Sequence, residues 1–211
     1  KSVNIDVPSD LSSSAFFIVA ALINNNSKIE MKNININPTR DGILIALKKM
    51  GANIKIKNKR IMSGEIVADI EAHSSTLNGC ELDADMAKLM IDEYPILSIA
   101  AANANSPSIF RGLGELKVKE SDRLELIRLN LTRCGCDCEV VDNDLIIKPS
   151  KNYMPIEHKI RTDFDHRIAM AFVVMGSRIG KLSIEDSECI NTSFPNFAET
   201  YNNAGGIFKW R

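Results

Sequence analysis

The chain has 211 residues, a formal net charge of −1, 45% hydrophobic residues and 25% charged residues. This composition is typical of a globular protein and argues against disordered, collagen-like and disulfide-stapled classes. Because the charge is nearly balanced, no bulk field recruits nucleic acid or an anionic membrane, and any anion site must be local. The longest uncharged apolar run, residues 15–23, is far shorter than the roughly 20 residues of a membrane-spanning helix, so we predict no membrane span.

The cysteine content predicts a cytoplasmic protein with reduced thiols. The five cysteines are an odd number, and no secretory signal precedes them. Cys134, Cys136 and Cys138 could suggest a site for a soft metal ion, but no second cysteine or histidine pair stands at zinc spacing. Alternate cysteines that enter a strand are usually packed, so we predict no metal site.

Three segments rich in small residues are apolar nearly all round, and each therefore predicts a buried helix. In chain order they are Leu11–Ile23, residues 92–104 and residues 165–178. A short strand is predicted after each helix, at residues 28–31, 107–111 and 181–185.

Each of these strands leads through a polar loop to a predicted amphipathic helix that ends at a glycine. The glycines are Gly51, Gly135 and Gly205, and glycine is the residue that a left-handed helix cap favours. Further strands are predicted at residues 53–57, 139–141, 145–148 and 207–210. Residues 60–81 are less regular and predict turns at residues 63–65 and 77–79 between short strands.

The three copies have the same internal spacing. The residue that opens each buried helix and a residue of the following polar loop are 28 positions apart in the pairs Asp10 and Pro38, Asp92 and Glu120, and Asp165 and Ser193. The pattern predicts an α/β fold with three repeats in one domain, roughly residues 1–82, 83–155 and 156–211, with the small-residue helices inside. Since the chain starts at Lys1 without a methionine and enters a strand-like pattern over residues 3–7, we expect a piece of a longer protein.

Charged residues gather at three of the predicted helix starts, at residues 92–93, 119–123 and 165–167. Helix starts carry unpaired N–H groups and the positive end of the helix dipole, so anions bind there. Two arginines, one lysine and several carboxylates would suit a small substrate with several negative charges, because arginine forks bind carboxylate or phosphate and carboxylates transfer protons.

A purely structural interpretation of these residues is equally open. Asp92 and Asp165 could be helix N-caps without a catalytic part. Residues 119–123 could be a solvated first turn with Ser121 as the cap and with acid–base pairs three or four positions apart.

Six segments in this order resemble the C-terminal half of the 5-enolpyruvylshikimate-3-phosphate synthase family. They are VPSDLSSSAFFIVAAL, NPTRDGIL, IDEYPILSIAAA, GELKVKESDRL, FDHRIAM and TSFPNF. The resemblance covers nearly the whole chain, and IDEYPIL with TSFP is similar to the bacterial branch that includes glyphosate-tolerant enzymes. It implies one lobe of an inside-out α/β barrel, built from three βαβαββ units with buried helices.

The resemblance also implies a reaction in the shikimate pathway of aromatic amino acid biosynthesis. The carboxyvinyl group of phosphoenolpyruvate is transferred to the 5-hydroxyl of shikimate 3-phosphate, and phosphate is released. By analogy with the family, Asp92 is the base for that hydroxyl and Glu120 carries the proton at the methylene carbon. Lys119 contacts the hydroxyl or the leaving phosphate and shares the acid role.

The donor would be held by three further residues. The resemblance implies that Arg123 and Arg167 bind the carboxylate and phosphate of phosphoenolpyruvate, with His166 assisting. Neither a metal nor an organic cofactor is required by this reaction.

This chain departs from the family in two ways that limit what the resemblance implies about its site and activity. Other branches have a lysine immediately before the T-F-P element, where this chain has Thr192, so no third cationic ligand is assigned there. The family's N-terminal lobe, which carries most of the contacts to shikimate 3-phosphate, is absent. We therefore expect this chain alone to be inactive. The alternatives are a lobe of the sister enolpyruvyl transferase that acts on UDP-N-acetylglucosamine, and a non-catalytic anion-binding lobe.

Overall fold

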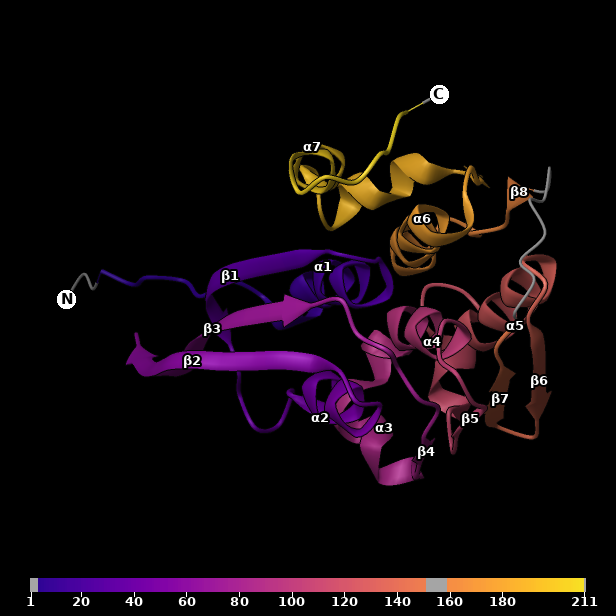
Figure 1. The fold of residues 1–211 in the computed structure, drawn as a ribbon, viewed down its shortest axis with the longest axis horizontal. Helices are drawn as coiled ribbons and strands as arrows, with labels where there is room; N and C mark the ends of the chain where they lie inside the picture. Colours follow the sequence, from indigo (N-terminus) through magenta and orange to yellow (C-terminus); the bar gives the residue numbers. More distant parts are fainter. Residues whose placement is uncertain (1–3, 151–158, 211) are drawn as a thin grey trace.

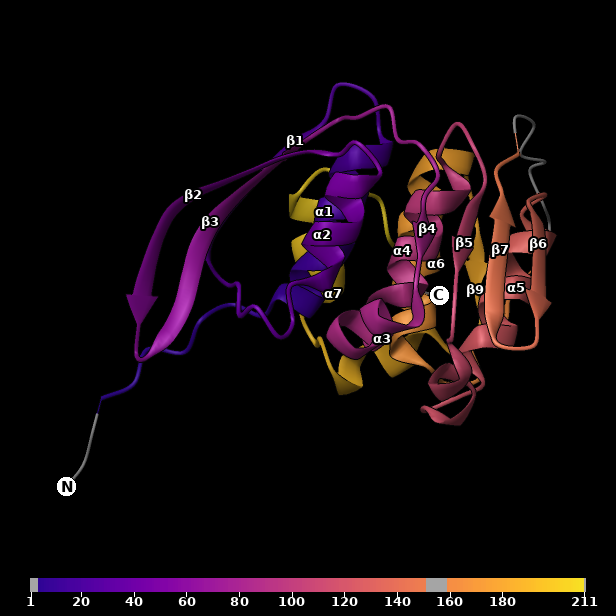
Figure 2. The ribbon, with the colours of Figure 1, turned by 90° about the horizontal axis from the view of Figure 1, so that it is seen from below.

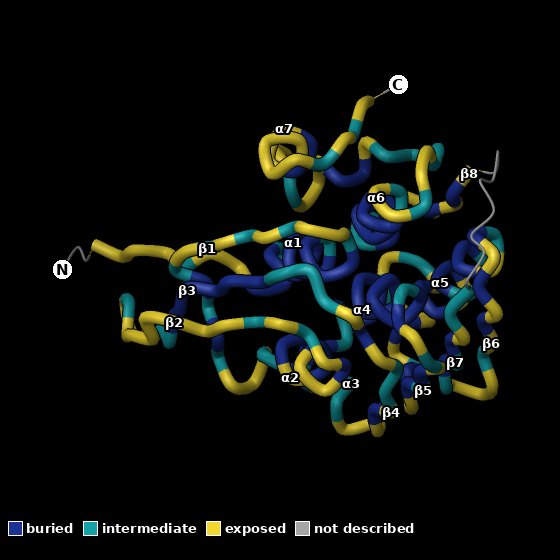
Figure 3. Tube along the Cα trace, viewed as in Figure 1, coloured by how far each residue is buried: buried dark blue, intermediate teal, exposed yellow. Residues whose placement is uncertain are grey.

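The computed structural model describes residues 4–150 and 159–210, and three helices form its centre. They are α1 (Leu11–Ile23), α4 (Tyr94–Ala102) and α6 (His166–Ile179). Each of them contacts the other two (Figure 1). Figure 3 shows buried chain along all three helices. Because α1 and α4 are apolar nearly all round, a central position removes most of their surface from water.

Three small sheets lie outside these helices (Figure 2). The first contains β1 (Lys28–Asn35), β2 (Asn53–Met62) and β3 (Glu65–His73) in the order β1-β3-β2, all antiparallel. The second contains β4 (Glu81–Leu82), β5 (Ser108–Phe110), β6 (Asp137–Val141) and β7 (Asp144–Lys148) in the order β4-β5-β7-β6. The third pairs β8 (Lys159–Ile160) with β9 (Ser183–Ile184). An α/β fold with helices inside is therefore confirmed.

Each central helix connects two segments of the chain that pair in parallel. The segment before the helix pairs with the strand after it, as a single bridge between Ser9 and Ile34, as β4 with β5, and as β8 with β9. This recurrence supports three repeats. Their division at residues 82 and 155 stays a prediction, and the second boundary lies outside the described residues.

The three amphipathic helices form as expected. They are α2 (Gly42–Lys49), α5 (Arg123–Arg133) and α7 (Phe197–Asn203). Gly51, Gly135 and Gly205 follow them with φ angles of 86°, 87° and 95°, which confirms the predicted left-handed caps.

Four shorter helical elements complete the fold. They are α3 (Ala84–Met90) and the 3-10 helices η1 (Ile91–Glu93), η2 (Gly114–Val118) and η3 (Ser187–Thr192). The α3 helix was not anticipated, although Asp83 marks its start and accepts hydrogen bonds from the backbone N–H groups of Asp85 and Met86.

The structure corrects two predicted strands. Residues 207–210 form no strand, because the backbone of Phe208 hydrogen-bonds to the side chain of Asn202 instead of to a neighbouring strand. At the other end, residues 4–7 form no strand, and residue 3 lies outside the described residues.

The stretch between residues 60 and 81 is more regular than predicted. It contains the nine-residue strand β3 at the centre of its sheet. The turn at Ser63 and Gly64 is confirmed, with positive φ at both residues. The prediction of a turn at residues 77–79 is wrong. The segment has no turn and runs close to the chain before β5. A Cβ atom on Gly79 would lie 2.0 Å from the carbonyl oxygen of Pro107.

No helix in the described part of the chain is both long and apolar enough to cross a membrane.

Candidate active site

The guanidinium group of Arg123 is the centre of a cluster of charged side chains. Arg123 begins α5, and its side chain is fully buried. Its Nη1 lies 2.9 Å from Oδ1 of Asp92, and its Nη2 lies 2.5 Å from Oε2 of Glu120. Its Nε lies 2.8 Å from Oδ2 of Asp165. One planar fork thus holds carboxylates from three separate parts of the chain in fixed positions.

Asp165 is the buried anchor of this cluster. It is the N-cap of α6, where Oδ1 accepts hydrogen bonds from the backbone N–H groups of Arg167, at 2.9 Å, and Ile168. Its Oδ2 accepts from Ser121 and from Arg123. The N-cap interpretation of Asp165 is therefore confirmed. Because a buried carboxylate is costly to desolvate, these bonds make the ion pair with Arg123 tolerable in the interior.

The same interpretation is wrong for Asp92, which lies within η1 and whose side chain faces cations. Its Oδ1 is 3.6 Å from Nζ of Lys119 as well as being bound to Arg123. Partial burial pushes the pKa of Asp92 upward, but the charges of Arg167, Lys119 and Arg123 outweigh it and hold that pKa below its ordinary value. Asp92 is therefore a stable carboxylate near neutral pH.

Ser121 does not cap α5, contrary to the structural interpretation of residues 119–123. Asp122 is the cap and accepts a hydrogen bond of 3.0 Å from the backbone N–H of Glu125. Ser121 instead donates its hydroxyl proton to Asp165. The first turn of α5 thus faces the charged cluster as well as solvent.

Asp92 and Glu120 are brought together, although they are 28 positions apart in sequence. Both bind terminal nitrogens of Arg123, and their side chains are 34% and 51% exposed. Two carboxylates held next to each other and open to solvent can each exchange a proton with a single small molecule.

Lys119 is held over the cluster by a residue that the sequence analysis missed. Its Nζ lies 2.6 Å from Oε1 of Glu115, one turn earlier along the chain. This hydrogen bond raises the pKa of Lys119, so the ammonium group stays charged. A glutamate four positions before a lysine was the available signal, since such pairs commonly interact.

Arg167 and His166 begin α6 beside the same cluster. Nη1 of Arg167 donates to the backbone oxygen of Asp92, at 3.1 Å, and to Oγ of Ser12, at 2.8 Å. His166 is half-buried, and burial lowers the pKa of its imidazole. All six predicted site residues thus lie at neighbouring helix starts. Arg123, however, is fully buried, so it could contact a substrate only if one of its carboxylate partners moved.

Ser12 and Glu93 also adjoin the site and had no predicted role in it. The hydroxyl of Ser12 donates to Oε1 of Glu93, which lies 3.7 Å from Nη1 of Arg167. Both residues line a pocket of about 390 Å³, which also contains Arg40 and the start of α1. Asp92 and Glu120 do not line this pocket, so the pocket is not the place where the two carboxylates could share a substrate.

The remaining candidates contribute no charged group. Thr192 donates its hydroxyl to the backbone oxygen of Cys189 within η3. Cys134, Cys136 and Cys138 are buried, and burial raises the pKa of their thiols to about 12, 11 and 12, so they stay protonated. The prediction that they are packed in the core is confirmed.

Comparison with known proteins gives consistent results. A family model described as EPSP synthase (3-phosphoshikimate 1-carboxyvinyltransferase) matches residues 1–201. A 3-phosphoshikimate 1-carboxyvinyltransferase from Paramagnetospirillum magneticum is 45% identical over 94% of this chain and 45% of its own length. One from Rhodospirillum rubrum is 42% identical over 97% of this chain and 46% of its own length.

Solved structures show the same coverage. An EPSP synthase from Acinetobacter baumannii matches 97% of this chain and 47% of its own chain, with a TM-score of 0.90 and 41% identity. An enolpyruvyl transferase from Streptomyces tendae, with a TM-score of 0.66 and 17% identity, shares the fold. The chain therefore spans about half the length of the relatives it matches.

Proposed function

Because this chain belongs to the EPSP synthase family, we propose that it is one lobe of an enzyme that transfers a carboxyvinyl group from phosphoenolpyruvate to the 5-hydroxyl of shikimate 3-phosphate. The relatives it matches are about twice as long, so the rest of the active site would come from a second lobe. We propose that this other lobe is the partner of the chain. The product would enter aromatic amino acid biosynthesis, and a cytoplasmic location stays a prediction.

The observation that carries this proposal is the attachment of Asp92 and Glu120 to one buried guanidinium group. The reaction needs two proton transfers on neighbouring atoms of one complex, one at the acceptor hydroxyl and one at the donor methylene carbon. Arg123 holds two carboxylates within reach of one another, and Asp165 holds Arg123. A rigid arrangement of this kind lowers the cost of bringing the reacting groups together.

In the addition step, Glu120 in its acid form gives a proton to the methylene carbon of phosphoenolpyruvate. The adjacent carbon becomes electrophilic and forms a bond with the acceptor oxygen, while Asp92 takes the proton of that hydroxyl. In the elimination step, the carboxylate of Glu120 removes a proton from the new methyl group. The bond between this carbon and the phosphate oxygen then breaks, the leaving phosphate takes up the proton that Asp92 had accepted, and Lys119 stabilises its negative charge.

The cations next to the carboxylates would bind the donor. The side chain of Arg167 is partly open to solvent, and His166 precedes it at the start of α6. We assign these two residues to the carboxylate and phosphate of phosphoenolpyruvate. Arg123 would join them when Glu120 turns toward the substrate and frees one of the Nη2 hydrogens.

The test is phosphate release from phosphoenolpyruvate in the presence of shikimate 3-phosphate. We expect none from the isolated chain, and we expect release when the chain is mixed with a separately produced N-terminal lobe. An Asp92→Asn chain in the same mixture is the matched control and should be inactive. Release by the isolated chain at the rate of a two-lobed enzyme would contradict the proposal. So would release that depends on UDP-N-acetylglucosamine as the acceptor.

A further inference from the structure

The starts of the three central helices meet at one hydrogen-bonded group formed by Ser12, Glu93 and Arg167. Ser12 is in the first turn of α1, Glu93 directly precedes α4, and Arg167 is in the first turn of α6. The contact between Arg167 and Ser12 joins residues 155 positions apart. One residue from each repeat thus contributes to this hydrogen-bonded group, which is well placed to hold the three helix starts in fixed positions relative to one another.

The polarity of the group is set by the single proton of the Ser12 hydroxyl. That proton is donated to Oε1 of Glu93, so the oxygen lone pairs face Nη1 of Arg167, at 2.8 Å. Without the glutamate, the hydroxyl would be free to rotate and could point its proton at the guanidinium. Glu93 therefore determines that Ser12 accepts from Arg167.

Glu93 is placed to act on Arg167 by charge as well. Its side chain is only 5% exposed, and its carboxylate lies 3.7 Å from Nη1. A buried carboxylate is strongly unfavourable unless a cation compensates it. Among the described residues, Arg167 lies within ion-pair distance of Glu93, and the Arg167 side chain is still 17% exposed. Nη1 of the guanidinium is thus held by Ser12 and by the backbone oxygen of Asp92, while part of the Arg167 side chain still reaches solvent.

We propose that Glu93, through Ser12, is a positioning residue that fixes the guanidinium of Arg167 in the orientation that binds the anionic donor. This inference rests on the proposed function, because it assigns a reason for the exact place of Arg167 in that site. Glu93 does not touch the substrate, and it acts only through Arg167.

The kinetic test uses the complete two-lobed protein and measures KM for each substrate. Glu93→Gln keeps the shape but removes the charge, and Ser12→Ala removes the connecting hydroxyl. We expect each to raise KM for phosphoenolpyruvate roughly tenfold, as the loss of one hydrogen bond to a charged group would. KM for shikimate 3-phosphate should stay within about twofold.

A double-mutant cycle separates positioning from general damage. In an Arg167→Lys background, Glu93→Gln should raise KM for the donor no further, because the group it acts through is gone. Ser98→Ala is the matched control, since the Ser98 hydroxyl is buried in α4 and has no hydrogen-bond partner among the described residues. Additive effects in the cycle, or an equal rise in KM for the acceptor, would overturn the inference.

A second readout is independent of activity. In nitrogen-15 NMR spectra of the protein, slow rotation of a fixed guanidinium gives separate Nη signals. We expect separate signals for Arg167 in the parent protein and averaged signals in Ser12→Ala. Signals that stay separate in both Ser12→Ala and Glu93→Gln would refute the positioning role. Absence of phosphate release by the parent protein would instead refute the proposed function.

Discussion

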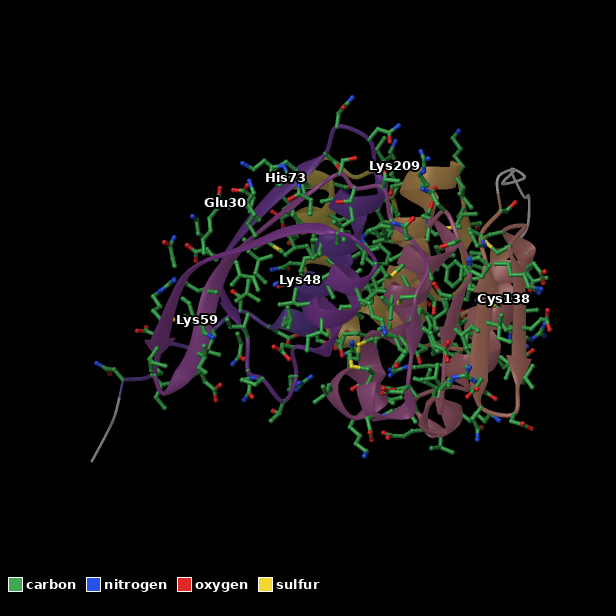
Figure 4. The ribbon with its side chains drawn as sticks, turned by 60° about the horizontal axis from the view of Figure 1, so that its bottom comes forward. Glu30, Lys48, Lys59, His73, Cys138 and Lys209 are labelled. Atoms are coloured by element: carbon green, nitrogen blue, oxygen red, sulfur yellow. The ribbon has the colours of Figure 1, made fainter. Side chains whose placement is uncertain are left out.

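Two ionic clusters in this molecule each surround one buried charged side chain with oppositely charged partners, but the sign of the buried charge differs. On the outer side of the first sheet, the carboxylate of Glu71 is surrounded by Lys28, Lys55, Lys57 and His73. In the candidate site the buried group is the cation, Arg123, and carboxylates surround it. Figure 4 shows His73 on the side of the sheet that faces away from the central helices.

The difference lies in which charges remain available. Glu71 is 7% exposed, and its partners are flexible lysine side chains that are about half exposed. They come from β1 and β2, the strands on either side of β3. In the candidate site, Asp92 and Glu120 are open to solvent while the guanidinium is closed off. Both clusters therefore have a buried central charge and exposed partners, but the exposed partners are carboxylates around Arg123 and mainly ammonium groups around Glu71.

The largest expected difference between the clusters is in catalysis. In the complete protein, Asp92→Asn should lower the rate of phosphate release by about 10²- to 10⁴-fold, because a general base is removed. Glu71→Gln should leave this rate within about twofold. Steady-state assays of both variants, with melting temperatures recorded alongside, test the contrast. Equal losses of activity at matched stability would show that the two clusters do not differ in this way.

The next largest difference is in stability. Arg123→Met leaves Asp165 buried without its cation, so we expect the free energy of unfolding to fall by about 3–5 kcal/mol. Lys57→Met removes one pair from the exposed side of the Glu71 cluster, and the expected loss is about 1 kcal/mol or less. Urea unfolding curves of the two variants measure both values. A loss at Lys57 as large as that at Arg123 would contradict the comparison.

A smaller effect should appear in the pH dependence of stability at Glu93. Burial raises the pKa of Glu93 above its ordinary value of 4.5, although Ser12, Arg167 and Arg40 offset part of the shift and Asp92 adds to it. The folded protein therefore binds this proton more tightly than the unfolded chain does. The resulting stability is fully present below pH 4.5 and is lost as the pH rises through the folded pKa.

Glu93→Gln removes this titration, so the stability of the variant relative to the parent should increase as the pH rises from about 4 to 8. Thermal unfolding at a series of pH values measures the difference. Glu71→Gln is the opposite control. Hydrogen bonds from Lys57 and His73 lower the pKa of Glu71, so its contribution is present at neutral pH and is lost in acid. A relative stability of Glu93→Gln that falls with pH would contradict the assignment.

Much of the fold was predictable because it depends on local rules. The boundaries of α1 were predicted to the residue, and the glycines after α2, α5 and α7 have the left-handed conformation that their positions indicated. The tail after Gly205 was not predictable in this way. Its apolar alternation is compatible with a strand, but a strand needs a partner strand. The backbone N–H and oxygen of Phe208 instead form hydrogen bonds with the side chain of Asn202.

The site was predictable in its members but not in its arrangement. The sequence by itself determined that charged residues stand at the starts of buried helices, because apolar periodicity and capping residues mark those starts within a few positions. Only the tertiary structure decided that Arg123 lies inside, that Asp165 holds it, and that Ser12 and Glu93 support Arg167. These contacts join residues tens of positions apart, and they depend on how the three central helices pack, which no local pattern encodes.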